Sequence, residues 1–121
     1  MNVMKTIMAI DDDEDFLLTF ARLIKSFGYN CYPLSNGHNL IGEINQMNPS
    51  LIFIDVFLKD QDGRDLCREL HERSRYRYIP IVMMSGLDLA EKDMECMPGS
   101  LFMRKPFNIP KIKNLIHNLI D

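Results

Sequence analysis

Apolar runs of strand length alternate with helical patterns along the chain. The runs occupy residues 6–10, 29–34, 50–58, 79–86 and 100–104, and each has the length of a β-strand. Between them, apolar residues recur every three or four positions, as on one face of a helix. The clearest helical patterns are Phe16, Leu17, Phe20, Leu23, Ile24 and Phe27, then Leu40, Ile41, Ile44 and Met47, and last Ile112, Leu115, Ile116, Leu119 and Ile120.

Turn-forming and capping residues mark where these elements begin and end. Gly28 is placed to end the first helix, and Asn108 with Pro110 is placed to begin the last one. Pro33 lacks an amide hydrogen, which suits an edge strand. A polar amphipathic stretch from Gly63 to about Tyr76 predicts a third helix. Residues 87–99 have weak periodicity, so the fourth helix is expected to be short or irregular.

Five strand-and-helix repeats predict an α/β fold, a doubly wound five-stranded parallel sheet with helices on both faces. In such sheets the ligand site lies beyond the carboxyl ends of the strands. The residues at those ends are Asp11, Asp12, Asp55, Ser85 and Lys105. We therefore expect three carboxylates, one hydroxyl and one ammonium group to meet at one edge of the sheet.

This set of side chains favours metal-assisted phosphoryl chemistry. Three neighbouring carboxylates need a cation or protons, and oxygen ligands suit Mg²⁺ or Mn²⁺. An aspartate beside such an ion can attack a phosphoryl group and form an acyl phosphate. Lys105 and the Ser85 hydroxyl could then contact the phosphoryl oxygens, and Gly86 leaves room for the group to approach.

Several acidic and basic residues also have simpler explanations. Asp13 to Asp15 suit a helix cap and the helix dipole, whereas a cap does not account for Asp11 and Asp12. The three histidines have no metal-like spacing and are expected at the surface or an interface. The mixed "RSRYRY" at 73–78 could contact nucleic acid, but a solvated helix end is the simpler interpretation.

Composition limits the class of protein. A chain of 121 residues is expected to form one domain, residues 1–121, and its formal net charge of -3 gives no general attraction to nucleic acid or membranes. The sequence shows no membrane-spanning run and no signal peptide. The odd, scattered cysteines, Cys31, Cys67 and Cys96, argue for a reducing cytoplasm and against a disulfide or zinc framework.

The ordered motifs resemble a response-regulator receiver domain of two-component signalling. The matching segments are "IDDDED", "FIDVFLKDQDG", "IPIVMMSG" and "RKPF", which together extend over essentially the whole chain. The resemblance implies a flavodoxin-like sheet of strand order 2-1-3-4-5 and a phosphoryl group carried by Asp55. It also implies a sensor histidine kinase or a histidine phosphotransfer protein as the phosphodonor.

The same resemblance assigns roles to individual residues. Asp11, Asp12, Asp55 and the backbone carbonyl of Phe57 would bind the metal, and Ser85 and Lys105 would contact the phosphoryl group. Phe102, three residues before the lysine, would take the aromatic switch position together with Ser85. The Lys105-Pro106 peptide bond would be cis.

The chain departs from the usual receiver pattern at several positions. Lys59 stands where a proline is common. The sequence between Ser85 and Lys105 is about two residues shorter than is usual in the family, and it contains Pro98. We therefore expect an altered fourth helix and an altered output or dimerisation face.

Three further departures concern side-chain chemistry. Phe102 replaces the commoner tyrosine and has no hydroxyl group. Phe57 and Leu87 stand where polar residues help to place the water that hydrolyses the acyl phosphate. Slow autodephosphorylation is therefore expected.

The expected protein is a phosphorylatable signalling domain rather than an enzyme. It is a stand-alone regulator or part of a longer chain, a monomer or a phosphorylation-dependent homodimer, with an unidentified downstream partner. One alternative is a pseudo-receiver that binds proteins without phosphorylation. Another is an aspartate-nucleophile phosphohydrolase, which is disfavoured because Phe57 stands where that family needs a second aspartate.

Overall fold

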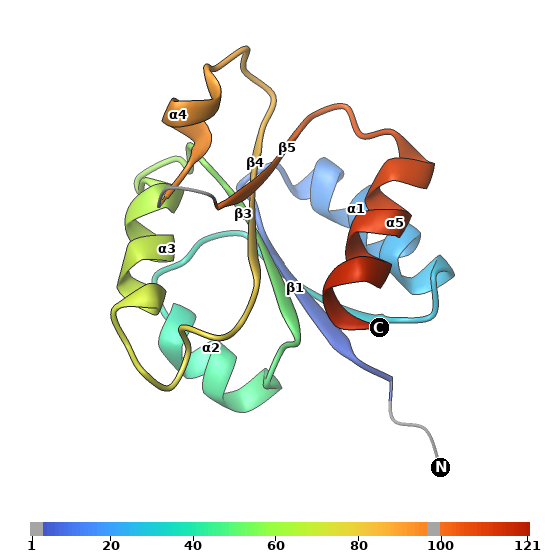
Figure 1. Ribbon diagram of the computed structural model, residues 1–121, viewed down its shortest axis with the longest axis horizontal. Coiled ribbons are helices and arrows are strands. Elements are labelled where there is room, and N and C mark those ends of the chain that lie inside the picture. The colour runs from blue at the N-terminus through green and yellow to red at the C-terminus, as the bar shows by residue number, and fades with distance from the viewer. Residues whose placement is uncertain (1–3, 97–99) are drawn as a thin grey trace.

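The protein is built on a five-stranded parallel sheet of order β2-β1-β3-β4-β5 (Figure 1). The computed structural model describes residues 4–96 and 100–121. The strands are β1 (Thr6–Ile10), β2 (Asn30–Leu34), β3 (Leu51–Asp55), β4 (Ile81–Ser85) and β5 (Leu101–Arg104). The helices are α1 (Glu14–Ser26), α2 (Leu40–Met47), α3 (Gly63–His71), α4 (Glu91–Met94) and α5 (Ile109–Ile120). The predicted fold class and strand order are confirmed.

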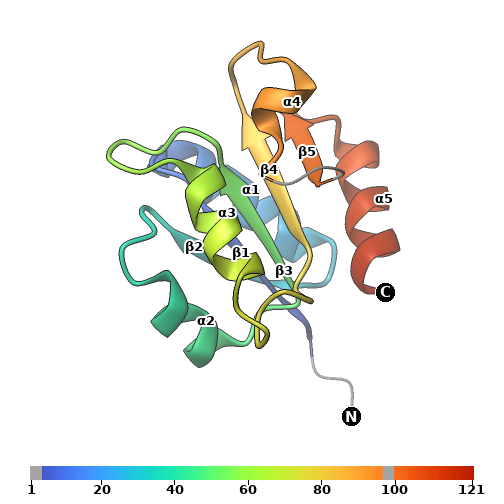
Figure 2. The same ribbon diagram turned by 60° about the vertical axis from the view of Figure 1, so that its left-hand side comes forward.

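Helices cover both faces of the sheet, as Figures 1 and 2 show. Successive strand residues point to opposite faces, so each strand contributes to two apolar layers. On one face α2 and α3 pack on the sheet through Leu40, Ile44, Leu66 and Leu70. On the other face α1 and α5 pack through Phe20, Ile24, Ile112 and Ile116. Every residue of β3 and β4 is buried, as expected for central strands of a doubly covered parallel sheet.

The capping residues that the sequence indicates act as caps in the structure. The Asp13 carboxylate accepts a hydrogen bond from the Phe16 backbone N–H at 3.1 Å, and Asn108 accepts one from Lys111 N–H at 3.0 Å. Gly28 follows α1 with a φ of 97°, a conformation that side chains disfavour. These local bonds fix where the first and last helices begin and end.

The helices are all short. The longest, α1, has 13 residues, and no helix within residues 4–96 and 100–121 has the length and apolar character to span a membrane. The predicted short fourth helix is confirmed, since α4 has only 4 residues. The third helix ends at His71, before the predicted limit near Tyr76, and turns follow it. Pro98 lies outside the described residues.

The expectation that no disulfide would form is wrong. Cys67 on α3 and Cys96 after α4 are joined, while Cys31 is free. The two bonded cysteines are separated by 29 positions in sequence. Sequence spacing could not indicate the pair because the fold alone brings α3 beside the end of α4.

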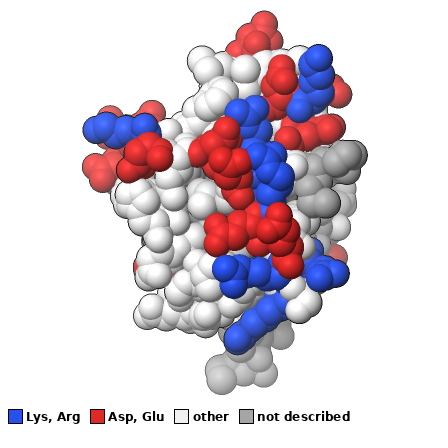
Figure 3. All heavy atoms as spheres, turned by 90° about the vertical axis from the view of Figure 1, so that its left-hand side faces the viewer, with Lys and Arg blue, Asp and Glu red and all other residues white. Residues whose placement is uncertain are grey.

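Charged side chains of both signs alternate along the face that α3 exposes. Figure 3 shows this face as a stripe of interspersed acidic and basic groups. Three ion pairs along α3 and its ends account for part of it, namely Arg64–Asp62, Arg68–Asp65 and Arg73–Glu69. This face therefore has a mixed charge and not a basic patch.

The sheet edge at β2 is interrupted by Pro33. Asn30 donates to Lys5 of the chain entering β1, and the Leu34 carbonyl accepts from Asp11. Because hydrogen-bonding direction alternates along a strand, Pro33 faces away from β1, toward the open edge. Its missing N–H therefore falls on the unpaired side, as the edge position predicted from the sequence requires.

Candidate functional site

The residues predicted at the strand ends meet at one edge of the sheet. Asp55 ends β3, Ser85 ends β4, and Asp11 and Lys105 directly follow β1 and β5. Asp11, Asp55 and Ser85 are the buried polar or charged residues of the described chain, with exposed fractions of 1%, 9% and 2%. Burial of polar groups is costly unless they are paired, so their convergence here marks a built site.

Three carboxylates lie close together in this site. One ligand oxygen from each of Asp11, Asp12 and Asp55 lies within 4.8 Å of the other two. Asp11 is buried, whereas Asp12 is exposed to solvent. The Oδ1 atom of Asp11 accepts a hydrogen bond from the Asp13 backbone N–H at 3.0 Å. The cluster is therefore anchored on the inside and open to solvent at Asp12.

Lys105 is the cation of the site. Its ammonium group donates a hydrogen bond to Asp11 Oδ2 and lies 4.0 Å from Asp55 Oδ1. It also lies 4.0 Å from the centre of the Phe16 ring, within the range of a cation–π contact. The Lys105-Pro106 peptide bond is cis, as the resemblance implied. These contacts hold the ammonium group between two carboxylates and an aromatic face.

The Asp55 carboxyl has an unusual affinity for protons. Burial and then the negative charge of Asp11 raise its pKa to about 7, although the nearby Lys105 acts in the opposite direction. Asp12 adds to the upward shift. One lysine thus does not neutralise three carboxylates, and the site has excess negative charge that a cation could offset.

The donor set fits a hard divalent cation. Carboxylate oxygens are the ligands that Mg²⁺ and Mn²⁺ prefer, and three of them are within reach of one ion here. Burial raises the pKa of Asp55 most, and the charges of Asp11 and Asp12 add to the shift, so a cation at this position would offset the cost of the ionised carboxyl. The ligand role predicted for the Phe57 carbonyl stays a prediction.

Ser85 and Gly86 border the space in front of Asp55. The Ser85 Oγ accepts a hydrogen bond from the Leu87 backbone N–H at 3.0 Å, so its hydroxyl hydrogen remains available to another acceptor. A Cβ added at Gly86 would find only the Lys105 Cδ, at 4.0 Å. The Leu87 side chain is 57% exposed. The turn after β4 therefore leaves open space next to the hydroxyl.

The loop after β3 is fixed by the start of α3. Asp62 caps α3 by accepting from Arg64 N–H at 2.9 Å, and the Arg64 guanidinium lies 5.1 Å from the centre of the Phe57 ring. Gly63 packs so tightly that a Cβ there would lie 1.9 Å from the Asp55 carbonyl oxygen. The start of α3 thus rests directly on the backbone of the central aspartate.

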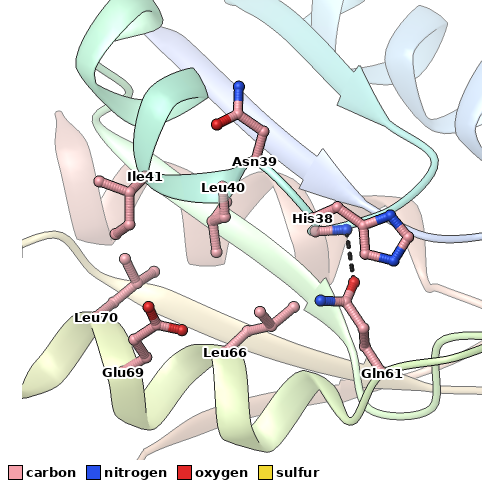
Figure 4. Close-up of a pocket in the computed structure, with 9 residues that line it drawn as sticks. His38, Asn39, Leu40, Ile41, Gln61, Leu66, Glu69 and Leu70 are labelled. Atoms are coloured by element: carbon pink, nitrogen blue, oxygen red, sulfur yellow. Dashed lines mark hydrogen bonds between the residues drawn. The ribbon is translucent and has the colours of Figure 1, made fainter.

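A second loop supports the same segment from the side. The Gly37 backbone N–H donates to Gln61 Oε1 at 2.9 Å, the hydrogen bond that is dashed in Figure 4. His38 contacts Asp60 at 3.0 Å. Gly37, His38 and Gln61 border a pocket of about 190 Å³ between the loop after β2 and α3. This pocket contains none of the predicted site residues, and its contacts hold the loop that follows Asp55.

Phe102 lies apart from the acidic cluster, on β5. It is partly buried against the core that contains α3, and the Arg104 guanidinium lies 5.7 Å from its ring centre. Arg104 also donates to the Leu89 carbonyl, which connects β5 to the segment before α4. The switch role of Phe102 remains a prediction.

An apolar groove of about 560 Å³ runs beside Lys105. Its walls come from α1 and from the connection between β5 and α5, and they include Phe16, Phe20, Leu23, Phe107 and Ile109. Ile109 is 53% exposed. The acidic cluster is therefore flanked by a surface that could contact an apolar part of another protein.

Sequence patterns did not reveal three residues that support the site. Phe16 was assigned to the core, yet its ring lies against Lys105. Gly63 and Arg64 begin the polar stretch that predicts the third helix, yet they pack on Asp55 and Phe57. The glycine directly after a capping aspartate was the available signal, because it marks a helix start that comes close to another backbone.

Known proteins with similar sequences are signalling proteins. The family model described as "Response regulator receiver domain" matches residues 7–117. Protein PilG of Pseudomonas aeruginosa is 28% identical over 104 residues, covering 84% of this chain and 77% of that protein. The polar-differentiation response regulator DivK of Brucella anthropi is 22% identical, covering 96% of both chains. Histidine kinase P4 of Formosa agariphila is 25% identical over 96% of this chain, which corresponds to 8% of that kinase.

Solved structures agree on the fold. A response regulator structure from Chloroflexus aurantiacus superposes with a TM-score of 0.86 at 20% identity, covering 98% of both chains. The chemotaxis protein CheY4 of Vibrio cholerae gives a TM-score of 0.84 at 18% identity, covering 97% of this chain and 99% of that one. The family match includes all the strand-end residues described above, and the chain therefore belongs to the family of response regulator receiver domains.

Proposed function

We propose that this chain is a phosphoacceptor domain of a two-component phosphorelay, with Asp55 as the residue that takes the phosphoryl group. The observation that carries the proposal is the convergence of the buried polar residues Asp11, Asp55 and Ser85 on one strand-end site beside Lys105. A purely structural role for Asp55 is disfavoured, because its raised pKa means that the folded chain bears a cost for its ionised form.

In the transfer step, an Asp55 oxygen forms a bond to phosphorus as the bond between phosphorus and the donor's histidine nitrogen breaks. The imidazole leaves with that electron pair. A bound Mg²⁺, held by Asp11, Asp12, Asp55 and the Phe57 carbonyl, would offset the negative charge of the carboxylates and the phosphoryl oxygens. Mn²⁺ could serve in the same way.

The chain's own groups complete the electrostatic stabilisation. The Lys105 ammonium group lies near both Asp11 and Asp55, so it can remain paired with a carboxylate while it contacts a phosphoryl oxygen. The Ser85 hydroxyl has its hydrogen free to donate to another phosphoryl oxygen. In the switch, Ser85 would move toward the phosphoryl group and Phe102 would turn inward.

The phosphodonor would be a sensor histidine kinase or a histidine phosphotransfer protein. The apolar groove beside Lys105 offers a contact for an apolar surface of such a protein. The mixed charge along α3 favours protein partners over nucleic acid at that face. Because histidine kinases use cytoplasmic ATP, we place the domain in the cytoplasm.

The remaining features of the proposal concern organisation. Residues 1–121 act as one domain that catalyses only its own phosphorylation and dephosphorylation. It signals to a downstream protein as a monomer or as a phosphorylation-dependent homodimer. A pseudo-receiver that works without phosphorylation is the alternative favoured by the short α4, which alters the usual output face.

The proposal is tested by incubation with Mg²⁺ and acetyl phosphate, followed by intact mass measurement. We expect one phosphoryl adduct on the wild type and none on Asp55→Asn. Asp60→Asn is the matched control, since Asp60 is an exposed acid in the loop after Asp55 and its ion-pair partner within the described chain is His38. Absence of an adduct with both Mg²⁺ and Mn²⁺ would contradict the proposal and favour the pseudo-receiver.

A further inference from the structure

We infer that Cys67 and Cys96 are a reversible redox pair that exchanges with small thiols of the glutathione class and controls how firmly the α4 segment is anchored to α3. The pair is separate from the acidic site, and no step of the phosphoryl transfer uses it. The reversibility of the pair, which is argued from the proposed cytoplasmic location, and its effect on Asp55 both rest on the proposed function, whereas the bond between the two sulfurs does not.

The two cysteines occupy an enclosed position between two elements. Cys67 lies in the middle of α3 with no exposed surface, and Cys96 lies two residues after α4 with 5% of its surface exposed. Their sulfurs are bonded in the structure. His71, one turn further along α3, has its Nδ1 3.9 Å from the Cys67 sulfur. A solvent thiol would therefore reach Cys96 before Cys67.

The bond replaces packing that a longer helix would provide. With 4 residues, α4 is too short to be stable by itself, and Met94 is its one buried residue. Besides the disulfide, a hydrogen bond from Arg64 to the Asp93 carbonyl at 2.7 Å connects α3 to α4. Loss of the covalent bond would leave the Arg64–Asp93 hydrogen bond to hold the segment to α3, with Met94 as the one side chain of α4 that is buried.

The chemistry is a thiol–disulfide exchange that consumes two small thiols. The first, as a thiolate, bonds to the Cys96 sulfur, and the Cys67 sulfur leaves as a thiolate and takes a proton from water. The second thiolate bonds to the small-molecule sulfur of the mixed disulfide, and Cys96 leaves as a thiolate and is protonated. The protein gains two electrons and two protons, and the two thiols become one small-molecule disulfide. The oxidising direction is the reverse.

The expected compartment favours reversibility. Disulfides in the cytoplasm are usually transient or redox-sensing, because glutathione and thioredoxin keep thiols reduced. A permanent structural bond would not suit a domain that receives its phosphoryl group from a cytoplasmic kinase. A pair that opens and closes with the thiol pool fits both the bonded sulfurs and that location.

The bond joins the two segments that border Asp55. On one side, α3 begins at Gly63, in direct contact with the Asp55 carbonyl. On the other side, Cys96 lies between Ser85 and Lys105 in the connection from β4 to β5. Arg104 adds a hydrogen bond to the Leu89 carbonyl within that connection. Opening the disulfide therefore loosens the segment whose two ends carry the phosphoryl contacts.

The first part of the test measures the bond itself. The protein is equilibrated with glutathione mixtures from oxidising to reducing, quenched in acid, denatured, treated with N-ethylmaleimide and weighed. We expect one adduct, on Cys31, in the oxidised form and three in the reduced form, in agreement with the chain's three cysteines. Cys31→Ser should give no adduct in the oxidised form and two adducts in the reduced form. Cys96→Ser should give two adducts in every buffer, because Cys67 then has no partner.

Two results of this titration would overturn the inference. Three adducts at every ratio would mean that the pair does not form, and one adduct at every ratio would mean that the bond is permanent. His71→Ala separates the redox pair from a zinc site, because Cys67, Cys96 and His71 could together bind Zn²⁺ when reduced. We expect this variant to titrate like the wild type. Loss of the disulfide in His71→Ala would also count against the redox pair.

The second part measures the consequence for the site. Hydrogen exchange should be at least about tenfold faster across residues 86–96 in the reduced wild type than in the oxidised form. The phosphoryl group on Asp55 should have a shorter lifetime in the reduced form, because water reaches it more easily. Cys96→Ser should resemble the reduced form in both buffers. Equal exchange rates and equal phosphoryl lifetimes in both redox states would refute the claim that the disulfide affects the Asp55 site. A failure to phosphorylate Asp55 would instead refute the proposed function and leave the adduct counts unaffected.

Discussion

The Asp55 carboxyl makes the stability of the folded chain depend on pH. Its pKa is raised to about 7 in the folded state, while an aspartate in the unfolded chain titrates near pH 4. Between these values the folded chain binds more protons than the unfolded chain, so raising the pH lowers the free energy of unfolding. The favourable contribution is complete below about pH 4 and is lost as the pH rises through about 7.

Replacement of Asp55 by asparagine removes this dependence. In EDTA at pH 8, Asp55→Asn should raise the free energy of unfolding by about 2 kcal/mol, because the neutral amide avoids burial of an unpaired charge. The gain should shrink as the pH falls toward 4 and vanish below it, where the wild-type carboxyl is protonated in both states. Urea titrations of both proteins at several pH values measure it. A gain that is the same at pH 4 and pH 8 would show that Asp55 does not titrate in this range.

Phe57 is the residue through which we expect the phosphoryl lifetime to be set. Its ring is 42% exposed and lies under the Arg64 guanidinium, so it offers no polar group to an attacking water. Phe57→Asn should therefore accelerate the loss of the phosphoryl group by about tenfold, less than the roughly hundredfold that a full general base contributes, because asparagine can position the water but cannot take its proton. Decay of the adduct after removal of the donor is the measurement. A fast wild-type decay that the substitution leaves unchanged would contradict the role of Phe57 in setting the phosphoryl lifetime.

At the scale of elements, the contact between α3 and β3 depends on one glycine. Gly63→Ala would place a methyl carbon 1.9 Å from the Asp55 carbonyl oxygen, so β3 or α3 has to move. We expect a loss of at least about 3 kcal/mol in the free energy of unfolding. Gly86→Ala is the matched control, because its added carbon meets only Lys105 Cδ at 4.0 Å. Thermal unfolding of the two variants measures this difference. Equal melting temperatures for Gly63→Ala and Gly86→Ala would refute the close contact.

The disulfide between α3 and the end of α4 also has a measurable effect on stability. It closes a loop of 29 residues, and the chain-entropy relation gives about 3.6 kcal/mol for a loop of this length. Reduction should lower the free energy of unfolding of the wild type by about that amount. Urea titration with and without reductant tests this, and Cys96→Ser should be insensitive to reductant. An equal response of the variant would point to an effect of the reductant elsewhere.

The element order was predictable because parallel strands and amphipathic helices have different apolar periods. The sequence placed every strand within a few residues, and it identified Gly28 and Asn108 as helix boundaries. The end of α3 was misplaced because the polar residues after His71 continue a helix-like composition while the chain already turns. The Cys67–Cys96 bond was missed because it depends on how two helices sit in space.

The site was predictable to the extent that it follows from topology. Parallel strands bring their carboxyl ends to one edge, so Asp11, Asp55, Ser85 and Lys105 had to converge once the strands were assigned. The contacts of Phe16 with Lys105 and of Gly63 with Asp55 did not follow from the strand order. They depend on side-chain direction and helix placement, which periodicity does not determine.

At the scale of the whole molecule, a bound divalent cation should stabilise the fold. Asp11, Asp12 and Asp55 come from two strand ends and approach one another only in the folded chain, so a Mg²⁺ ion held by them would bind the folded state preferentially. At about 100 times its dissociation constant, Mg²⁺ should add about 2.7 kcal/mol to the free energy of unfolding. Thermal unfolding with and without Mg²⁺ measures this gain.

Asp12→Asn should lose most of the Mg²⁺ effect, while the exposed loop variant Asp60→Asn should retain it. Asp12 is solvent-exposed, so the substitution leaves the core unchanged and the comparison reports on the ion. The same stabilisation of Asp12→Asn as of the wild type would place the cation somewhere else on the molecule.

The proline on the open edge of β2 limits how copies of this chain can associate. Pro33 presents no N–H on the side that faces solvent, and at the opposite edge β5 has only 4 residues. Both edges are therefore poor templates for continuous pairing with a strand of another molecule, and such edges resist aggregation. We expect any association between copies of this chain to proceed through helical faces, where contacts can form and dissociate without the persistence of a continuous intermolecular sheet.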